Sequence, residues 1–439
     1  MNNSPVILKF GGAALNGPEG FARFESILRE YAGRKTLIVI SAFSKSTRRL
    51  ARAARFAESG ELDSALDLAC GIVSSHRDFA RALISPGTEF DRLMSDIDSA
   101  ADRLNRFLRG IYITRELTAR TLDSVLSFGE LFALRIIDVF LDRCGIGHRT
   151  IDAAELIVTD SSHGRAEPIT DLCRDNVYRS LMPAFDYSDL VITQGFVARS
   201  ADGEITTMGI ESSNLTAILL ADLTGAGRVS FLTDVDGIMT ADPLYINDAV
   251  NIPHMDYLTA HLAALAGLKL IYPPMIEIAA RNNIEFEFRN AFSDGPSTIV
   301  SAGAGEIQRP MVIIRRDLCC RKYRFDKSSQ LKSAINMFAD QIPDMFSMNI
   351  IQPEIAITAP CGRMSNLNIS HADLSAELNS LNAISVIFPN EFICNNYAGK
   401  LVADMAPRAV MTESAGRVLR FFTIEDPAAM ASEIHSRIV

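Results

Sequence analysis

Short, uninterrupted apolar runs alternate with amphipathic segments along the first 300 residues. Four of these runs are typical of strands buried on both faces of a parallel sheet, at residues 5–10, 36–40, 190–193 and 229–233. Further strands are expected near 155–158 and at 284–288, and helices at about 17–31 and 257–266. This alternation predicts a layered α/β domain with a mainly parallel central sheet.

A long helical segment interrupts the alternation. From about Arg48 to Cys144, apolar residues recur at three- and four-residue spacing, as at Leu104 and Leu108, without strand-like alternation. Gly129 lies inside this segment, where glycine costs about 1 kcal/mol relative to alanine. It therefore predicts a close backbone approach or a helix break, and the adjacent Glu130 is either a functional carboxylate or an exposed salt-bridge partner.

The pattern changes after residue 303, and Gly303 and Gly305 mark a boundary. Short strands alternate there with helical patterns near 329–340 and 371–381. A strand at 418–424 and a helix at 426–438 close the chain. We expect one domain over residues 1–303 and small α+β modules over residues 304–439.

Composition narrows the function classes. A net charge of −10 over 439 residues argues against sequence-independent nucleic-acid binding, which needs a basic face. No segment has the pattern of a signal peptide or membrane span, so a cytoplasmic protein without membrane contact is expected. The seven cysteines show no metal-binding spacing, which favours a reducing compartment, mostly buried thiols and no protein-held metal.

Two turns after predicted strands carry candidate chemistry. In Lys9-Phe-Gly-Gly12 the glycines bare the backbone for a polyphosphate and Lys9 adds a positive charge, although a plain turn is an equal alternative. The hydroxyl-rich loop from Ser41 to Thr47 either orients a polar substrate or caps the following helix.

The segment from Thr206 to Leu220 combines a glycine turn with a helix start. Such a start offers backbone N–H groups to an anion, while Ser213 and Asn214 are also ordinary helix-capping residues. The acidic loop after Thr233 follows another strand, where open α/β sheets bind ligands. This loop lacks the glutamate that a calcium loop requires.

The order of these motifs resembles that of the aspartate kinases of the amino-acid kinase superfamily. The resemblance rests on eight segments in the expected sequence: Lys9-Phe-Gly-Gly12, Ser41–Thr47, Ser127-Phe-Gly-Glu130, Gly195-Phe196, Thr206-Thr-Met-Gly209, Thr233-Asp-Val-Asp-Gly237, Asp242-Pro243 and Gly267-Leu-Lys269. Residues 304–439 are similar, more loosely, to the paired ACT regulatory modules of such kinases. The resemblance implies an amino-acid kinase domain over residues 1–303 and a homodimer that pairs through ACT modules.

The resemblance also implies phosphoryl transfer from ATP to a carboxylate of aspartate or a related amino acid. Mg²⁺ is expected to arrive with ATP. A catalytic role is implied for Lys9, Lys269 and Asn214. The implied ATP-binding residues are Gly11, Gly12, Gly209, Ser213, Thr233, Asp234 and Lys269, and the implied substrate-binding residues are Ser41, Thr47, Glu130 and Glu211.

The sequence departs from the family pattern in the segment that binds substrate. The family reads Thr-Thr-Leu-Gly-Arg-Gly-Gly-Ser-Asp, and here Ile210 replaces its arginine and Asn214 its aspartate. Further departures are Ala13-Ala14 for Thr-Ser, Glu211 and Ser212 for the glycines, Met239 for a tyrosine and Leu244 for an arginine. Three hypotheses compete: a kinase with a changed acceptor, in which Glu211 meets an amino or cationic group; a catalytically silent regulatory paralogue; and a different nucleotide-dependent reaction.

Overall fold

The computed structural model describes residues 4–43, 45–303, 309–325, 328–342, 345–351, 353–364 and 372–439. These residues divide into two compact units. The first contains the chain up to Gly237 together with Pro274–Ala302, and the second contains Ile238–Pro273 together with the chain from Gly303 onward. Gly305 of the predicted boundary lies outside the described residues.

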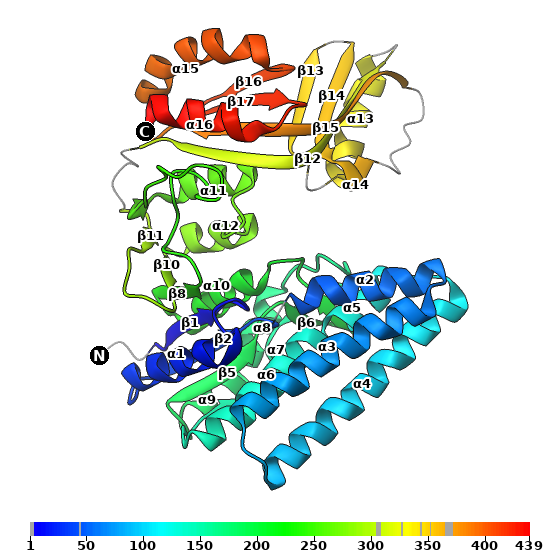
Figure 1. Ribbon diagram of the computed structural model, residues 1–439, viewed down its shortest axis with the longest axis vertical. Helices are drawn as coiled ribbons and strands as arrows, with labels where there is room; N and C mark the ends of the chain where they lie inside the picture. Colours follow the sequence, from blue (N-terminus) through cyan, green and yellow to red (C-terminus); the bar gives the residue numbers. More distant parts are fainter. Residues whose placement is uncertain are drawn as a thin grey trace. The chain divides into compact units, whose positions relative to one another are not determined.

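The first unit is built on a central sheet whose core strands run parallel (Figure 1). Their order is β5-β2-β1-β8-β10, with β3 (Arg149–Thr150) beyond β5 and the antiparallel β11 (Thr298–Val300) beyond β10. The parallel core consists of β1 (Val6–Phe10), β2 (Thr36–Ile40), β5 (Leu190–Gln194), β8 (Arg228–Thr233) and β10 (Glu285–Asn290). Every residue of β2 and β5 is buried, as the continuous apolar runs predicted.

Helices cover both faces of this sheet. On one face, α1 (Gly17–Glu30) packs against β1 and α6 (Phe128–Arg143); the rings of Phe10 and Phe24 are 4.7 Å apart, and those of Phe21 and Phe140 are 5.0 Å apart. Successive strand residues point to opposite faces. The alternate residues of β1 and β8 therefore point away from this cluster, and α10 (Ser213–Thr224) packs against both strands.

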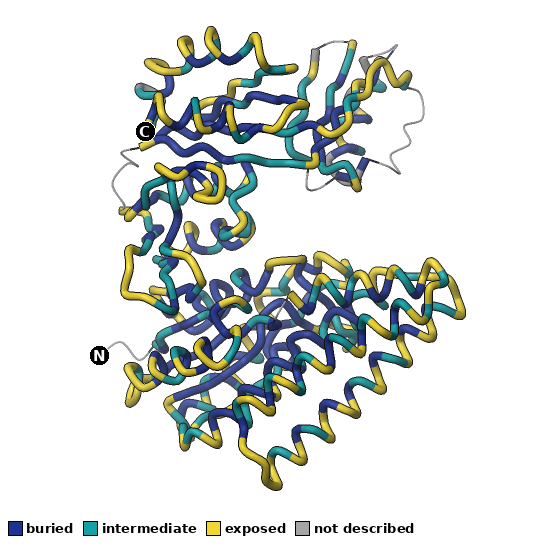
Figure 2. The backbone as a smooth tube through the Cα atoms, viewed as in Figure 1, coloured by how far each residue is buried: buried dark blue, intermediate teal, exposed yellow. Residues whose placement is uncertain are grey.

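The predicted helical segment is confirmed. It contains α2 (Ser46–Ser59), α3 (Leu62–Leu83), α4 (Thr88–Thr114) and α5 (Ala119–Leu126) ahead of α6. Figure 2 shows α4 with one buried and one exposed side, and Leu104, Leu108 and Ile111 are on the buried side. The break expected near Gly129 is at Ser127, between α5 and α6.

The strand expected near residues 155–158 is partly wrong. Residues Ala153–Leu156 form the short helix α7, because the Asp152 side chain accepts a hydrogen bond from the N–H group of Ala154 and caps it. Only Val158–Thr159 form a strand, β4, which pairs with β6 (Val197–Ser200). β6 forms an antiparallel hairpin with β7 (Ile205–Thr207).

The second unit contains a sheet in the order β13-β14-β12-β15-β17-β16, and all its described pairings are antiparallel. Its strands are β12 (Met311–Arg324), β13 (Ser347–Ile351), β14 (Glu354–Pro360), β15 (Asp373–Ile387), β16 (Met411–Ala415) and β17 (Val418–Thr423). One apolar cluster packs α15 (Glu391–Met405) and α16 (Pro427–Ile438) on the sheet, and a second packs α13 (Ser328–Gln341) and α14 (Cys361–Met364). This antiparallel unit is consistent with ACT-like modules.

Other parts of the second unit include α11 (Tyr257–Ala266) and the two-residue strand β9 (His254–Met255). The predicted helices at 257–266 and 329–340 and the elements at the end of the chain are confirmed. Within the described residues, no helix combines the length and apolar character needed to cross a bilayer.

The helix expected at 371–381 is wrong. Residues 373–381 belong to β15, which pairs with β12 over most of its length; His371 lies outside the described residues. Leu374, Leu378 and Leu381 have helical spacing in the sequence, yet they lie in an irregular strand: its register against β12 shifts, and Ser380 has a φ of 59°. Backbone pairing with β12 therefore decides the conformation here, against the local pattern.

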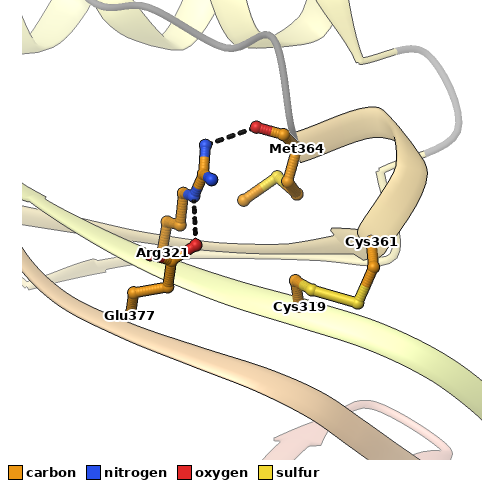
Figure 3. The surroundings of a disulfide bond; sticks show 5 residues. All are labelled: Cys319, Arg321, Cys361, Met364 and Glu377. Carbon is orange, nitrogen blue, oxygen red and sulfur yellow. Dashed lines mark hydrogen bonds and ion pairs between the residues drawn. A yellow bond between two sulfur atoms is a disulfide. The ribbon is translucent and has the colours of Figure 1, made fainter.

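The expectation of unpaired thiols is wrong for two cysteines. Cys319 on β12 and Cys361 at the start of α14 form a disulfide, although 42 residues separate them (Figure 3). Arg321 on the same strand also ties α14 down, because its guanidinium donates hydrogen bonds to the Met364 carbonyl oxygen and to Glu377. The free cysteines Cys173, Cys320 and Cys394 are buried, as expected, whereas Cys70 is exposed.

Candidate functional site

The loops at the carboxyl ends of β1, β2 and β8 bring several predicted site residues together. Gly11 and Gly12 follow β1, Ser41 follows β2 and Thr233 ends β8. Because these strands are adjacent and parallel, their carboxyl ends lie at one edge of the sheet, the edge where open α/β sheets bind ligands.

Two glycines follow β1, and no side chain would fit at the second of them. The N–H group of Gly11 donates to the carbonyl oxygen of Leu232 at 2.9 Å, which joins the turn to β8. A Cβ atom at Gly12 would lie 2.2 Å from the carbonyl oxygen of Ala42. At Gly11 it would lie 4.0 Å from the Lys9 Nζ atom. The turn therefore presents bare backbone beside the lysine ammonium, a suitable cradle for a polyphosphate.

Lys9 and Glu130 form the electrostatic centre of the first unit's site. Burial lowers the pKa of the Lys9 ammonium to about 8, and the charges of Glu211 and Glu130 oppose that shift. Burial also raises the pKa of the Glu130 carboxyl to about 8, against backbone hydrogen bonds from Glu130 and Ala42 and the charge of Lys9. Both shifts show that desolvation outweighs the attraction between the two groups.

Glu130 is 2% exposed, so the alternative of an exposed salt-bridge partner is wrong. Its position in the first turn of α6 is fixed by Gly129, where a Cβ atom would lie 3.1 Å from the Ala42 Cβ atom and 3.4 Å from that of Ser46. The Oε2 atom of Glu130 is buried without a hydrogen-bond partner among the described residues. A buried carboxylate oxygen of this kind fits a cationic ligand.

Ser41 and Thr47 are both partly buried, on either side of the start of α2. The capping alternative gains no support among the described residues, because Lys45 is the N-cap residue and its side chain makes no capping hydrogen bond. The Ser46 hydroxyl instead donates to the carbonyl oxygen of Phe43. Ser44, within this loop, lies outside the described residues.

The turn from Gly209 to the start of α10 has a constrained backbone. Gly209 and Glu211 have φ values of 100° and 74°, and glutamate rarely adopts the second. Ser212 is the N-cap residue, and its side chain makes no capping hydrogen bond; Ser213 and Asn214, the expected capping residues, lie inside the first turn of the helix. Ser213 packs directly against the end of β5, where a Cβ atom at Gly195 would lie 2.7 Å from the Cα atom of Ser213. Asn214 is partly buried in the first turn of α10.

Arg48 is a residue that the sequence analysis missed. Its Nη2 atom lies 3.4 Å from the Oε1 atom of Glu211, and the two side chains are 67% and 44% exposed. Ile210, beside Glu211, is 58% exposed. The position of Arg48 immediately after Thr47, a predicted substrate-binding residue, is the feature of the sequence that could have indicated it.

In the loop after β8, Asp236 and not the predicted Asp234 accepts the hydrogen bonds that hold the loop in place. Asp234 is exposed, whereas Asp236 accepts hydrogen bonds from the Asn290 Nδ2 atom at 2.8 Å and the Ser293 hydroxyl at 3.1 Å. Thr233 donates to the carbonyl oxygen of Val235 at 3.1 Å, so its hydroxyl shapes the same turn.

Lys269, the second predicted catalytic lysine, belongs to the second unit. It is exposed in a turn that follows Gly267, which ends α11 with a φ of 114°. The structure therefore presents the Lys269 side chain to solvent. Leu244, in the same unit, is 87% exposed.

The first comparison is with protein families. The profile described as the amino acid kinase family matches residues 4–290, about two thirds of the chain and nearly all of the first unit. The chain belongs to the amino acid kinase family. The match covers the Lys9 and Glu130 site and the strands that carry it.

Aspartokinases are among the similar curated proteins, which confirms the resemblance drawn from the motif order. The family member described here is 29% identical over 279 residues to lysine-sensitive aspartokinase 3 of Escherichia coli, covering 64% of this chain and 60% of that protein. It is 28% identical over 296 residues to bifunctional aspartokinase/homoserine dehydrogenase 2 of Zea mays, covering 66% of this chain. That alignment spans 32% of the plant protein's length.

Solved structures establish the fold over nearly the whole chain. Escherichia coli aspartokinase III in complex with aspartate and ADP superposes with a TM-score of 0.85 and 21% identity, covering 98% of this chain and 99% of that one. The same enzyme in complex with lysine and aspartate gives a TM-score of 0.72. The predicted fold class, an α/β kinase fold followed by ACT-like modules, is confirmed.

Proposed function

We propose that this amino acid kinase transfers the γ-phosphoryl group of ATP to a side-chain carboxylate of aspartate or a related amino acid, giving an acyl phosphate. The observation that carries the proposal is the desolvated Lys9 and Glu130 pair beside the bare backbone of Gly11 and Gly12. The aspartokinase relatives support the substrate class.

A carboxylate acceptor explains why the site needs no general base. An aspartate side chain has an ordinary pKa near 3.9 and is already ionised at neutral pH. The protein must therefore position two anionic reactants and neutralise charge between them. In the proposal, Lys9 supplies positive charge, and the backbone of Gly11 and the N–H groups of Gly12 and Gly209 line the phosphates.

Glu130 binds the ammonium group of the acceptor. Its buried Oε2 atom lacks a hydrogen-bond partner among the described residues, and a cation beside it would lower the pKa of the carboxyl and restore the charged form. Ser41 and Thr47, which flank the start of α2, hold polar atoms of the same ligand.

The remaining assignments follow the family pattern. Thr233 and Asp234 line the nucleotide pocket, and Ser213 lines it from the start of α10. Asn214 and Lys269 act in catalysis with Lys9, and Lys269 adds a second positive charge. Mg²⁺ arrives with ATP and supplies further charge neutralisation. Among the described residues no group of three or more His, Cys, Asp or Glu side chains could hold a metal ion.

The second unit, with its ACT-like modules, has a regulatory role in the proposal, and two copies of the chain form a homodimer through these modules. A competing function, a silent regulatory paralogue, is favoured by Ile210 and Asn214, which replace the arginine and aspartate of the family pattern. The proposal also includes an altered specificity for the acceptor, and this part too rests on the replacements at Ile210 and Asn214.

Trapping of the acyl phosphate with hydroxylamine separates the two functions. The purified protein is incubated with Mg-ATP, hydroxylamine and a panel of acidic amino acids, and the hydroxamate is measured. The kinase proposal expects hydroxamate with at least one acid and stabilisation of the protein by Mg-ATP. Binding of nucleotide without hydroxamate from any acid would reject the carboxylate kinase and leave the regulatory paralogue.

A further inference from the structure

We propose that Arg48 binds the α-carboxylate of the acceptor amino acid and so replaces the guanidinium that Ile210 lacks. The inference rests on the proposed function, because it concerns the acceptor half of the same site.

Position 210 cannot bind a carboxylate in this chain. Ile210 follows Gly209, and more than half of its side chain is exposed. An aliphatic side chain offers no hydrogen-bond donor, whereas an arginine fork can donate two parallel hydrogen bonds to a carboxylate. The first unit must therefore supply the positive charge from another element if the acceptor's α-carboxylate is to be neutralised.

Arg48 lies on an element that is fixed beside Glu130. It occupies the first turn of α2, next to Thr47 and two residues after the buried Ser46. The start of α2 packs against α6 at Gly129, where a Cβ atom would lie 3.4 Å from the Ser46 Cβ atom. Glu130, the proposed ammonium ligand, is the next residue. The same end of α2 therefore packs beside Glu130 through Ser46 and carries the Arg48 guanidinium, which reaches Glu211.

Glu211 links Arg48 to the lysine. Its carboxylate lies 3.4 Å from the Arg48 Nη2 atom, and its charge also raises the pKa of Lys9. Arg48 therefore reaches a group that acts on the phosphoryl-transfer lysine. Glu211 already has a cation from its own chain, so no additional amino group on the acceptor is needed to explain its presence.

The Arg48–Glu211 ion pair is suited to exchange. At 3.4 Å it is longer than the 2.7–2.9 Å usual for charge-assisted hydrogen bonds, and both side chains are substantially exposed. Exposed ion pairs contribute little to stability. A ligand carboxylate can therefore replace Glu211 as the ion-pair partner of Arg48. In the absence of the ligand, Glu211 holds Arg48 near the site.

Equilibrium binding tests this inference independently of turnover. Calorimetric titration with aspartate, in the presence of a non-hydrolysable ATP analogue and Mg²⁺, is compared for the wild type, Arg48→Ala and Arg52→Ala. Arg52 is the matched control, one turn further along α2, where its guanidinium lies 5.0 Å from the ring centre of Phe56. We expect Arg48→Ala to weaken aspartate binding at least about tenfold, without a loss of thermal stability, and Arg52→Ala to bind as the wild type does.

Two further comparisons identify the group of the ligand that Arg48 binds. β-Alanine lacks the α-carboxylate of aspartate, so the wild type should prefer aspartate and Arg48→Ala should lose most of that preference. Adding Ile210→Arg to Arg48→Ala should restore aspartate binding. Undiminished aspartate binding by Arg48→Ala, an equal loss in Arg52→Ala, or no restoration by Ile210→Arg would each overturn the inference.

The outcome is separable from that of the proposed function. If the wild type binds aspartate but yields no hydroxamate, the kinase proposal fails while the binding comparison still decides the role of Arg48. If the wild type binds no acidic amino acid at all, the role of Arg48 is rejected as well.

Discussion

A Cβ atom at Gly12 would meet the carbonyl oxygen of Ala42 at 2.2 Å. The turn after β1 and the loop after β2 thus touch through backbone atoms alone. Ala42 is also the residue whose N–H group faces the Glu130 carboxylate and whose Cβ atom packs toward Gly129. Any displacement of this loop is therefore passed to Lys9 and Glu130 together.

We expect Gly12→Ala to destabilise the protein by about 1–3 kcal/mol, because a methyl group forced against backbone cannot be relieved by a side-chain rotation. Turnover should fall more than tenfold as the loop shifts. The control is Gly110→Ala in α4, where an added Cβ atom has nothing within 4 Å. That change should stabilise the helix by about 0.5–1 kcal/mol. Denaturant unfolding of both variants measures the contrast, and a fully active Gly12→Ala protein would show that the close approach is dispensable.

Glu130→Gln should raise stability at alkaline pH while it weakens acceptor binding. The pKa of Glu130 is raised from 4.5 to about 8, so the native state keeps a proton that the unfolded state loses between these values. This group therefore makes the unfolding free energy fall as the pH rises through that window. The advantage of Glu130→Gln should grow from near zero at pH 4.5 to a few kcal/mol above pH 8.

Unfolding curves at pH 5, 7 and 9 measure this effect, with the exposed Glu155→Gln as control. A constant difference between Glu130→Gln and the wild type at all three pH values would contradict the desolvated carboxyl. So would an equal pH dependence of the difference in Glu155→Gln.

Glu211→Gln should move the alkaline limit of turnover to lower pH. Lys9 must be protonated to neutralise the phosphoryl group, and its pKa is lowered to about 8 by burial while the Glu211 charge raises it. Removing that charge lets the pKa of Lys9 fall further. The pH dependence of kcat under saturating substrates gives the limit. A shift to higher pH would exclude Lys9 as the group that titrates.

His76→Phe should reduce the sensitivity of the protein to acid. His76 is buried in α3 between the rings of Phe43 and Phe132, and burial lowers its pKa from 6.5 to about 4. Between these values the unfolded state binds a proton that the native state does not, so stability falls as the pH drops from 6.5 to 4. Phenylalanine removes this contribution, about 3 kcal/mol across the window. Unfolding free energies at pH 7 and 4 measure it, and an unchanged pH 7 to pH 4 difference in His76→Phe would refute it.

The sequence predicted the parts of the site that depend on strand order and glycine. Lys9, Gly11 and Gly12 follow a continuous apolar strand, and the carboxyl ends of parallel strands meet wherever the helices between them pack. Gly129 could be recognised as a close approach because glycine is costly inside a helix. These residues have strong local signatures, so reasoning from the chain alone located them.

Other features depend on contacts that no local pattern encodes. The Arg48–Glu211 ion pair joins residues 163 positions apart, and the Cys319–Cys361 disulfide joins residues 42 apart. The β15 segment has leucines at helical spacing, yet its pairing with β12 gives it a strand conformation. In each case a distant partner decides the outcome, and the partner is not visible from the segment itself.

The two long strands of the second unit have a mechanical consequence. β12 and β15 each run past both sets of helices, so the halves of this sheet share continuous backbone. The register between the two strands shifts between Arg315 and Leu318, between Leu318 and Cys320, and between Lys322 and Tyr323, and Asp317 and Ser380 have φ values of 61° and 59°. The two halves of the sheet are therefore joined by strands that both halves share, and a ligand bound on either half would act on the same two strands.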